Sequence, residues 1–139
     1  MSNALIVAGS LANIVVAVTA GAALYLAWSQ IKLSRELSAL DAYERYHEMC
    51  MEYPQYVDGS LDYKTLNATE RSCYETFVLY TLMIDERIYS LFPDDDAWHY
   101  SIMDDIRSHK PFIGSDDFGH HLEGQGWTIT PLIKRVLAE

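Results

Sequence analysis

Charged side chains are missing from the start of this sequence: residues 1–31 contain no Lys, Arg, Asp, Glu or His. Proline is absent from residues 4–28, so nothing in that segment interrupts a helix. A helix rises about 1.5 Å per residue, so a helix of this length exceeds the roughly 30 Å hydrocarbon core of a bilayer. Residues 1–30 are therefore predicted to be a single transmembrane anchor.

Basic residues are scarce in the remainder. The chain has 10 Lys and Arg against 20 Asp and Glu, which gives a formal charge of -10. This balance argues against nucleic acid as a partner, because a phosphate backbone is bound by a basic stripe. The excess acids suit a well-solvated surface, or alternatively a docking face for a basic partner. Residues 31–139 are predicted to form an acidic domain outside the bilayer.

Cysteines are few, and the common catalytic motifs are missing. Cys50 and Cys73 are too few for a disulfide framework. In the cytoplasm we expect both to be reduced and buried, whereas an extracytoplasmic domain could join them by one bridge. There is no Gly-x-Ser-x-Gly elbow and no glycine-rich phosphate loop. The sequence therefore predicts a protein that is not an enzyme and needs no cofactor.

The residues after the apolar segment predict its orientation. Tyr25 and Trp28 lie where aromatic rings favour the lipid headgroups, and Lys32 and Arg35 follow directly. The positive-inside rule then places the domain in the cytoplasm and the N-terminus outside, in the plasma (inner) membrane. A cleaved signal peptide is the competing interpretation, but it would have a basic start and a shorter apolar region.

One face of the apolar segment is built from small residues. They recur every four positions as Gly9, Asn13, Ala17 and Gly21, with an adjoining row of Ala4, Ala8 and Ala12. Small residues let helix backbones approach closely in lipid, and a carboxamide there needs a hydrogen-bond partner. We predict a helix-packing interface on this face. The alternative is that Ala and Gly are simply common in membrane spans.

The domain is predicted to be all-α, because no segment alternates in the manner of a strand. The anchor should continue as one amphipathic helix that ends before Pro54. Its predicted apolar face consists of Leu33, Leu37, Leu40, Tyr43, Tyr46, Cys50 and Tyr53. Residues 54–66 are predicted to be a loop, since they contain Pro, Asp-Gly and Ser.

Further helix signals follow this loop. Asn67 and Glu70 have capping-box spacing, and the helix they begin should end before Pro93. Residues 94–96, all Asp, suit the start of another helix, which Lys110-Pro111 should close. Its predicted apolar stripe is Trp98, Ile102 and Ile106. A short helix over 115–123 and a last helix capped by Thr130 complete a predicted bundle of about four helices.

Metal binding is the best alternative that involves chemistry. Glu44 and His47 have the Glu-x-x-His spacing of carboxylate-bridged di-metal bundles. Such a site needs more ligands, for which Glu75, Asp85 and Glu86 are available. A second cluster is formed by Asp116, Asp117, His120 and His121, whose four-residue spacing suits helix ion pairs equally well.

The order of features resembles that of uncharacterised bacterial one-span membrane proteins with a C-terminal helical domain. The features are the N-terminal span, a helix that ends in Glu52-Tyr53-Pro54, a long apolar helix, the acidic Asp94–Trp98 segment and a closing helix. The resemblance covers nearly the whole chain. It implies no activity and no site residues.

Three hypotheses for function follow. The first is a non-catalytic accessory or assembly subunit of a membrane complex, with the lipid bilayer and other membrane proteins as its partners. The second is a membrane-tethered metalloenzyme or metal sensor that uses Glu44 and His47. The third is a self-associating signalling adaptor, which would make the protein a homo-oligomer.

Overall fold

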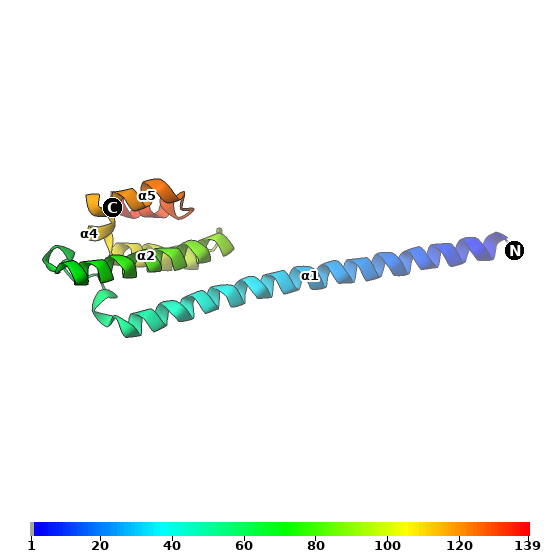
Figure 1. Cartoon of the computed structure of the whole chain (residues 1–139). Coiled ribbons are helices and arrows are strands. Elements are labelled where there is room, and N and C mark those ends of the chain that lie inside the picture. Colours follow the sequence, from blue (N-terminus) through cyan, green and yellow to red (C-terminus); the bar gives the residue numbers. More distant parts are fainter. Residues whose placement is uncertain (1) are drawn as a thin grey trace. The chain divides into compact units, whose positions relative to one another are not determined.

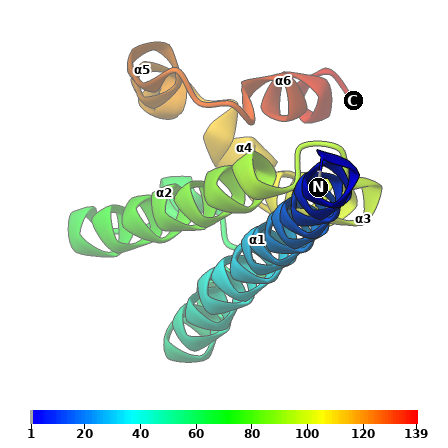
Figure 2. The ribbon, with the colours of Figure 1, turned by 90° about the vertical axis from the view of Figure 1, so that its right-hand side faces the viewer.

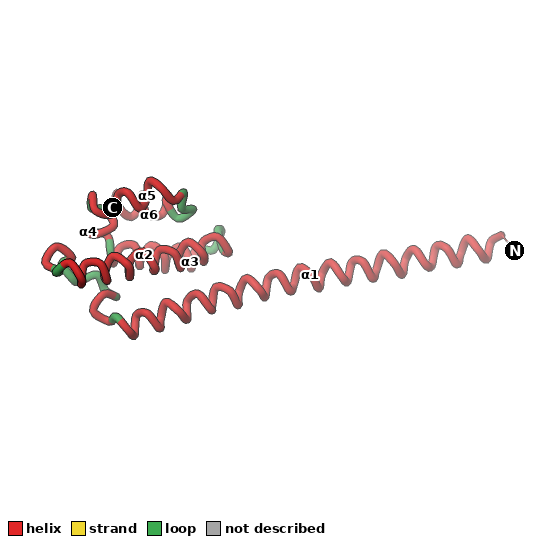
Figure 3. The backbone as a smooth tube through the Cα atoms, viewed as in Figure 1, coloured by secondary structure: helices red, strands yellow, loops and turns green. Residues whose placement is uncertain are grey.

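Most of the chain is helical in the part that the structure describes. The computed structural model describes the backbone of residues 2–139 and the side chains of residues 13–119, 121 and 126–139. Within that backbone there are α-helices and 3-10 turns but no strand, which confirms the predicted all-α class (Figures 1 and 3). The α-helices are α1 (Ser2–Glu52), α2 (Ala68–Leu91), α3 (Asp96–Ser108), α4 (Lys110–Ile113), α5 (Asp116–Gln125) and α6 (Thr130–Ala138).

The chain divides into two compact units, Met1–Ser38 and Ala39–Glu139. The predicted division at residues 30 and 31 concerns a different property, namely where the lipid should end. In the first unit, α1 is long and apolar enough near the N-terminus to cross a membrane. The mean hydropathy of its best 18-residue window is 1.7, and no residue of that window is buried. The same length and composition also fit a signal sequence.

The second unit has a hydrophobic core built from α1 residues after 38 and from the later helices. α3 packs against both α2 and α6, and α5 and α6 lie on one side of α2 (Figure 2). Aliphatic and aromatic side chains fill the interior, among them Val78, Leu82, Ile102, Ile106, Phe112, Phe118, Ile129, Ile133 and Val136. Burial of this set, at about 25 cal/mol per Å² of apolar area, is the main force that holds the helices together.

Several helix boundaries follow from local capping. The Asn67 side chain accepts hydrogen bonds from the amides of Thr69 and Glu70, and the Glu70 carboxylate accepts one from the Asn67 amide. The predicted capping box is therefore confirmed. α2 ends at Leu91, before Pro93 as predicted, and Asp95 caps α3 through the amides of Ala97 and Trp98.

The predicted apolar face of α1 is wrong in its first part. Leu33, Leu37 and Leu40 are exposed, whereas Ala39 and Ala42 are buried. Alanine brings a helix backbone closer to its neighbours than leucine does, and hydrophobic spacing alone does not show which apolar stripe is covered. From Tyr43 to Cys50 the prediction holds better, since Tyr46 is buried and Tyr43 and Cys50 are half-buried. Tyr53, the last predicted member, is exposed.

Smaller corrections concern the connections. The predicted loop at 54–66 contains two 3-10 turns, Pro54–Tyr56 and Tyr63–Thr65, and each buries a tyrosine. Pro111 lies in the first turn of α4, where its missing N–H costs nothing, after α3 has ended at Ser108. α5 continues to Gln125 instead of ending at 123. The residue before α6 is Ile129, so Thr130 is its first residue and not its cap.

Candidate functional site

The small-residue row of α1 lies on an uncovered surface where the structure describes it. Asn13, Ala17 and Gly21 are exposed, and a methyl group added at Gly21 would meet nothing within 4 Å beyond the adjacent backbone of its own helix. The other members of the predicted interface, Gly9, Ala8 and Ala12, lie outside the residues whose side chains are described. The row therefore leaves room for a close neighbour along residues 13–21.

The predicted interface anchors are also exposed. The rings of Tyr25 and Trp28 lie 6.4 Å apart, tilted toward each other on adjacent turns. Lys32 lies 3.9 Å from Glu36 on the next turn. Orientation in membranes follows the count of Lys and Arg and is little affected by nearby acids, so this pair does not cancel the contribution of Lys32.

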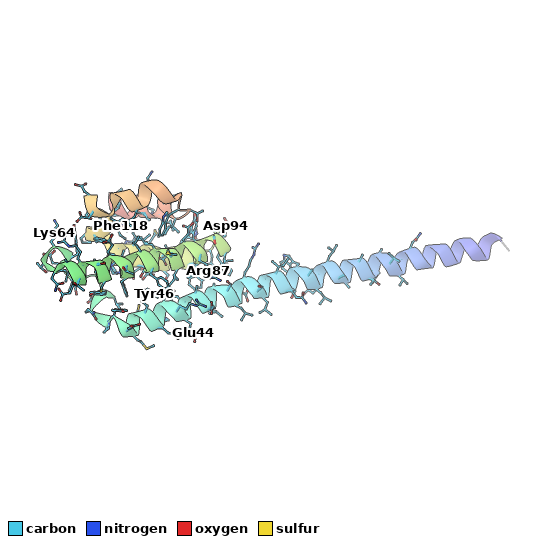
Figure 4. All side chains as sticks on the ribbon, in the orientation of Figure 1. Glu44, Tyr46, Lys64, Arg87, Asp94 and Phe118 are labelled. Atoms are coloured by element: carbon cyan, nitrogen blue, oxygen red, sulfur yellow. The ribbon has the colours of Figure 1, made fainter. Side chains whose placement is uncertain are left out.

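The predicted metal ligands do not gather into a larger group. Glu44 lies on the side of α1 that faces away from α2 (Figure 4), and both Glu44 and His47 are exposed. The imidazole of His47 packs edge-on against Tyr43, with ring centroids 4.5 Å apart. Among the described side chains, no group of three or more His, Cys, Asp or Glu is placed to hold a metal ion.

The second predicted cluster is used for a contact between helices. Nε2 of His121, on α5, lies 3.0 Å from a carboxylate oxygen of Glu75 on α2. This pair ties α5 to the side of α2. The side chain of His120 lies outside the described residues. Asp116 and Asp117 occupy the first turn of α5, where acids interact favourably with the helix dipole.

The most unusual polar cluster, formed by Tyr46, Asp85 and Asp105, was not predicted from the sequence. The Tyr46 hydroxyl, from α1, donates a hydrogen bond of 2.9 Å to Oδ1 of Asp105 on α3. Figure 4 shows Tyr46 on the side of α1 that faces α2. Burial and the Asp105 charge both raise the pKa of Tyr46, so its hydroxyl stays protonated and serves as a donor.

Asp85 of α2 is the deepest member of this cluster, and only 3% of its surface is exposed. Its Oδ2 has no hydrogen-bond partner among the described residues. Burial, and then the Asp105 charge, raise the pKa of Asp85 well above its ordinary value. Burial likewise raises the pKa of Asp105 to about 6, although the Tyr46 hydrogen bond and His47 act in the opposite direction.

A signal for this cluster is present in the sequence. Asp85 follows the apolar run at 77–84 and falls on the same helical spacing as Val78, Leu82 and Ile88, which are buried. An acid at a predicted core position is the kind of residue that marks a functional or strained site. The partnership with Tyr46 and Asp105 depends on three helices meeting, and helical periodicity does not predict that.

A second buried polar contact joins His109 to Tyr74. The Tyr74 hydroxyl lies 3.0 Å from Nδ1 of His109, and only 1% of His109 is exposed. Burial lowers the pKa of His109 to about 4, so the ring is neutral at physiological pH. Phe77 and Phe112 pack edge-on against this pair, which makes it part of the core.

A shallow groove of about 220 Å³ lies between the end of α1 and the first half of α2. It is lined by Met49, Tyr53, Ser72, Cys73, Thr76, Phe77 and Tyr80. Its lining is mainly apolar, and Cys73 is exposed at its surface. This corrects the expectation that both cysteines are buried, since Cys50 is half-buried and Cys73 is exposed.

The fold and these clusters define a class of protein: over its described residues the chain is all-α, with one helix, near the N-terminus, that is long and apolar enough to cross a membrane. Comparison with known proteins adds no closer relationship. No protein-family model, no curated protein and no solved structure matches the chain significantly. Function is therefore inferred from the physical properties of the chain itself.

Proposed function

We propose that this protein is a non-catalytic accessory or assembly subunit of a membrane protein complex. A single span would anchor it in the plasma membrane, with the N-terminus outside and residues 31–139 in the cytoplasm. The observation that carries the proposal is the uncovered row of Asn13, Ala17 and Gly21 on an apolar helix.

The physics of helix association in lipid supports a partner on this row. Lipid tails are as apolar as leucine, so helices gain little from the hydrophobic effect when they associate. Close backbone packing over small residues and hydrogen bonds between helices drive association instead. Ala17 and Gly21 provide the close approach, and Asn13 provides a carboxamide that is costly to leave facing lipid.

The polar groups of the domain support a structural role. Three side-chain contacts join segments that are distant in the sequence: Tyr46 to Asp105, Glu75 to His121, and Arg107 to Glu139. Such contacts stabilise a fixed shape, and a subunit that caps or positions a partner needs a fixed shape.

The test is affinity purification of the full chain in mild detergent. In the double variant Ala17→Leu/Gly21→Leu, two leucines cover the small-residue row. We expect the amount of co-purified partner to fall by at least about tenfold, equivalent to 1.4 kcal/mol of binding free energy. Thr19→Leu/Ala23→Leu is the matched control, because these residues have the same spacing on the opposite face. Equal recovery of partners with both double variants would remove the row as the docking element.

A self-associating adaptor is the second candidate, and one observation favours it. Leu33, Leu37 and Leu40 are exposed at three- and four-residue spacing, as in a helix that pairs with another. Crosslinking in native membranes distinguishes the candidates. A dimer of this chain alone supports the adaptor, whereas crosslinks to a different protein support the accessory subunit. The metal-binding hypothesis for Glu44 and His47 predicts stoichiometric Fe, Mn or Zn in the purified protein.

A further inference from the structure

Three helices of the domain meet at a pair of acids, of which Asp85 is buried and Asp105 is half-buried. Asp85 comes from α2 and Asp105 from α3, and Tyr46 of α1 is hydrogen-bonded to Asp105. The charge that acts most strongly on Asp85 is therefore another negative charge. This arrangement is unlike a buried salt bridge, in which a cation compensates the carboxylate.

An ionised Asp85 would be costly in this position. Its carboxyl group is almost completely removed from water, and Oδ2 lacks a partner among the described residues. A buried acid of this kind avoids the cost by keeping its proton. Asp105 is better placed to ionise, since the Tyr46 hydroxyl donates to it.

We propose that Asp85 and Asp105 together hold one proton in the folded domain near neutral pH, and that loss of this proton loosens the attachment of α1 through Tyr46. With the proton on Asp85, only one negative charge is present, and the Tyr46 hydrogen bond stabilises it on Asp105. Without the proton, two like charges share a buried site at which the helices meet. The device is a pH-sensitive latch between the end of α1 and the bundle.

The groups that face the pair come from both neighbouring helices. Tyr46, His47 and Cys50 belong to α1, and Asp104 is the adjacent acid on α3. Cys50 lies one turn after Tyr46 and interacts with its hydroxyl. Cys50 is half-buried, so its thiol reports whether this end of α1 is attached.

The sign of the pH dependence follows from proton linkage. The pKa of each acid is higher in the folded domain than in the unfolded chain. At a pH between the unfolded and folded pKa values of an acid, the folded state therefore binds more protons than the unfolded state. The stabilisation is fully present below about pH 4. The first proton leaves Asp105 as the pH passes about 6, and the latch opens as the pH rises further, through the raised pKa of Asp85. For one linked proton, the equilibrium constant for opening rises by up to about tenfold per pH unit in this window.

The test is maleimide labelling of Cys50 in the full chain, reconstituted in lipid nanodiscs with Cys73→Ser. Dividing each rate by the rate for the urea-unfolded chain at the same pH removes the intrinsic pH dependence of thiol chemistry. We expect this normalised rate to rise about tenfold from pH 6 to pH 8. Asp85→Asn, a neutral isostere of the protonated acid, should abolish the rise.

Asp105→Asn provides a second route to the same result, because it removes the like charge and leaves an oxygen that can accept from Tyr46. Either variant suffices if the other does not fold. Asp104→Asn is the matched control on the exposed neighbour, and it should keep the rise. A flat profile in the parent chain, or the same rise in all variants, would overturn the latch.

Discussion

Gly59 occupies a backbone position that a side chain cannot share. Its φ is +61°, and a Cβ at this position would overlap the backbone carbonyl of Ser108. Gly59→Ala therefore combines left-handed strain with a clash against main-chain atoms that cannot rotate away. We expect a loss of about 3 kcal/mol in the free energy of unfolding. This loss is measured by urea unfolding of the full chain in detergent, monitored by near-UV circular dichroism, with the parent chain as the reference.

Gly126 is the control for the strain alone. Its φ of +58° is nearly the same, but a Cβ there would meet nothing within 4 Å. Gly126→Ala should lose only about 1 kcal/mol, which is the usual cost of a left-handed alanine. Equal losses of unfolding free energy for the two variants would show that the close approach of Gly59 to Ser108 contributes nothing to the effect.

At the residue scale, the sequence predicted the Asn67–Glu70 cap correctly but placed the cap of α6 at Thr130 instead of Ile129. The Asn67–Glu70 box was predictable because its hydrogen bonds lie within one turn. The burial of Tyr56 and Tyr63 in a predicted loop was not predictable from the sequence. The burial of a neutral His109 in the core was not predictable either. Those three depend on contacts with residues distant in the sequence, which no local pattern encodes.

At the element scale, a single carboxylate of α2 holds the turn that precedes α6. Oε1 of Glu86 accepts hydrogen bonds from the amide and hydroxyl of Thr128, at 2.8 and 2.7 Å, and Oε2 accepts one from the Ile129 amide at 3.0 Å. These amides lie at the start of α6, where backbone N–H groups lack helical partners. Glu86→Ala should loosen α6 by about 2 kcal/mol.

Hydrogen exchange of the α6 amides tests this prediction, with the α2 amides as the internal reference. Arg107→Ala is the comparison variant. It removes a two-pronged contact to Glu139 at 2.8 and 2.9 Å, but that contact lies at the surface, where water and salt weaken it. We expect α6 to exchange distinctly faster in Glu86→Ala than in Arg107→Ala, and the reverse order would contradict the role of Glu86.

The existence of the main helices was predictable from the sequence because apolar spacing, caps and prolines agree along most of the chain. The buried face of α1 was not predictable from the sequence. Leu40 and Ala39 are adjacent and both apolar, yet the bundle covers the alanine and leaves 59% of Leu40 exposed. The smaller side chain allows closer packing against the neighbouring helices. Which side chain is covered therefore depends on the shape of those helices. The Tyr46–Asp105 contact escaped prediction for the same reason.

At the scale of the whole molecule, a helix long and apolar enough to cross a membrane is the feature most directly readable from sequence, because length and hydropathy define it without tertiary contacts. The predicted direction of crossing rests on only two bases, Lys32 and Arg35. The docking role of Asn13, Ala17 and Gly21 stays a prediction, since it concerns a partner that the chain does not encode.

Cys73 makes the topology testable without a tag. It is exposed on the domain, and Cys50→Ser leaves it as the only thiol of the chain. If residues 31–139 are cytoplasmic, a membrane-permeant maleimide should label Cys73 in intact cells and an impermeant one should not. Both should label it equally after lysis, which is the control for access. The physical reason is that a charged reagent cannot cross the bilayer that separates it from the domain.

Two results would contradict this topology, and they point to different errors. Labelling by the impermeant reagent in intact cells would place the domain outside, where a Cys50–Cys73 bridge becomes favourable in the parent chain. An intact mass that lacks the apolar segment would instead identify a cleaved signal sequence and remove the anchor. In that case the row at 13–21 would have no role in the mature protein. The latch at Asp85 would stand, because Asp85, Asp105 and Tyr46 all lie in the unit from Ala39 to Glu139.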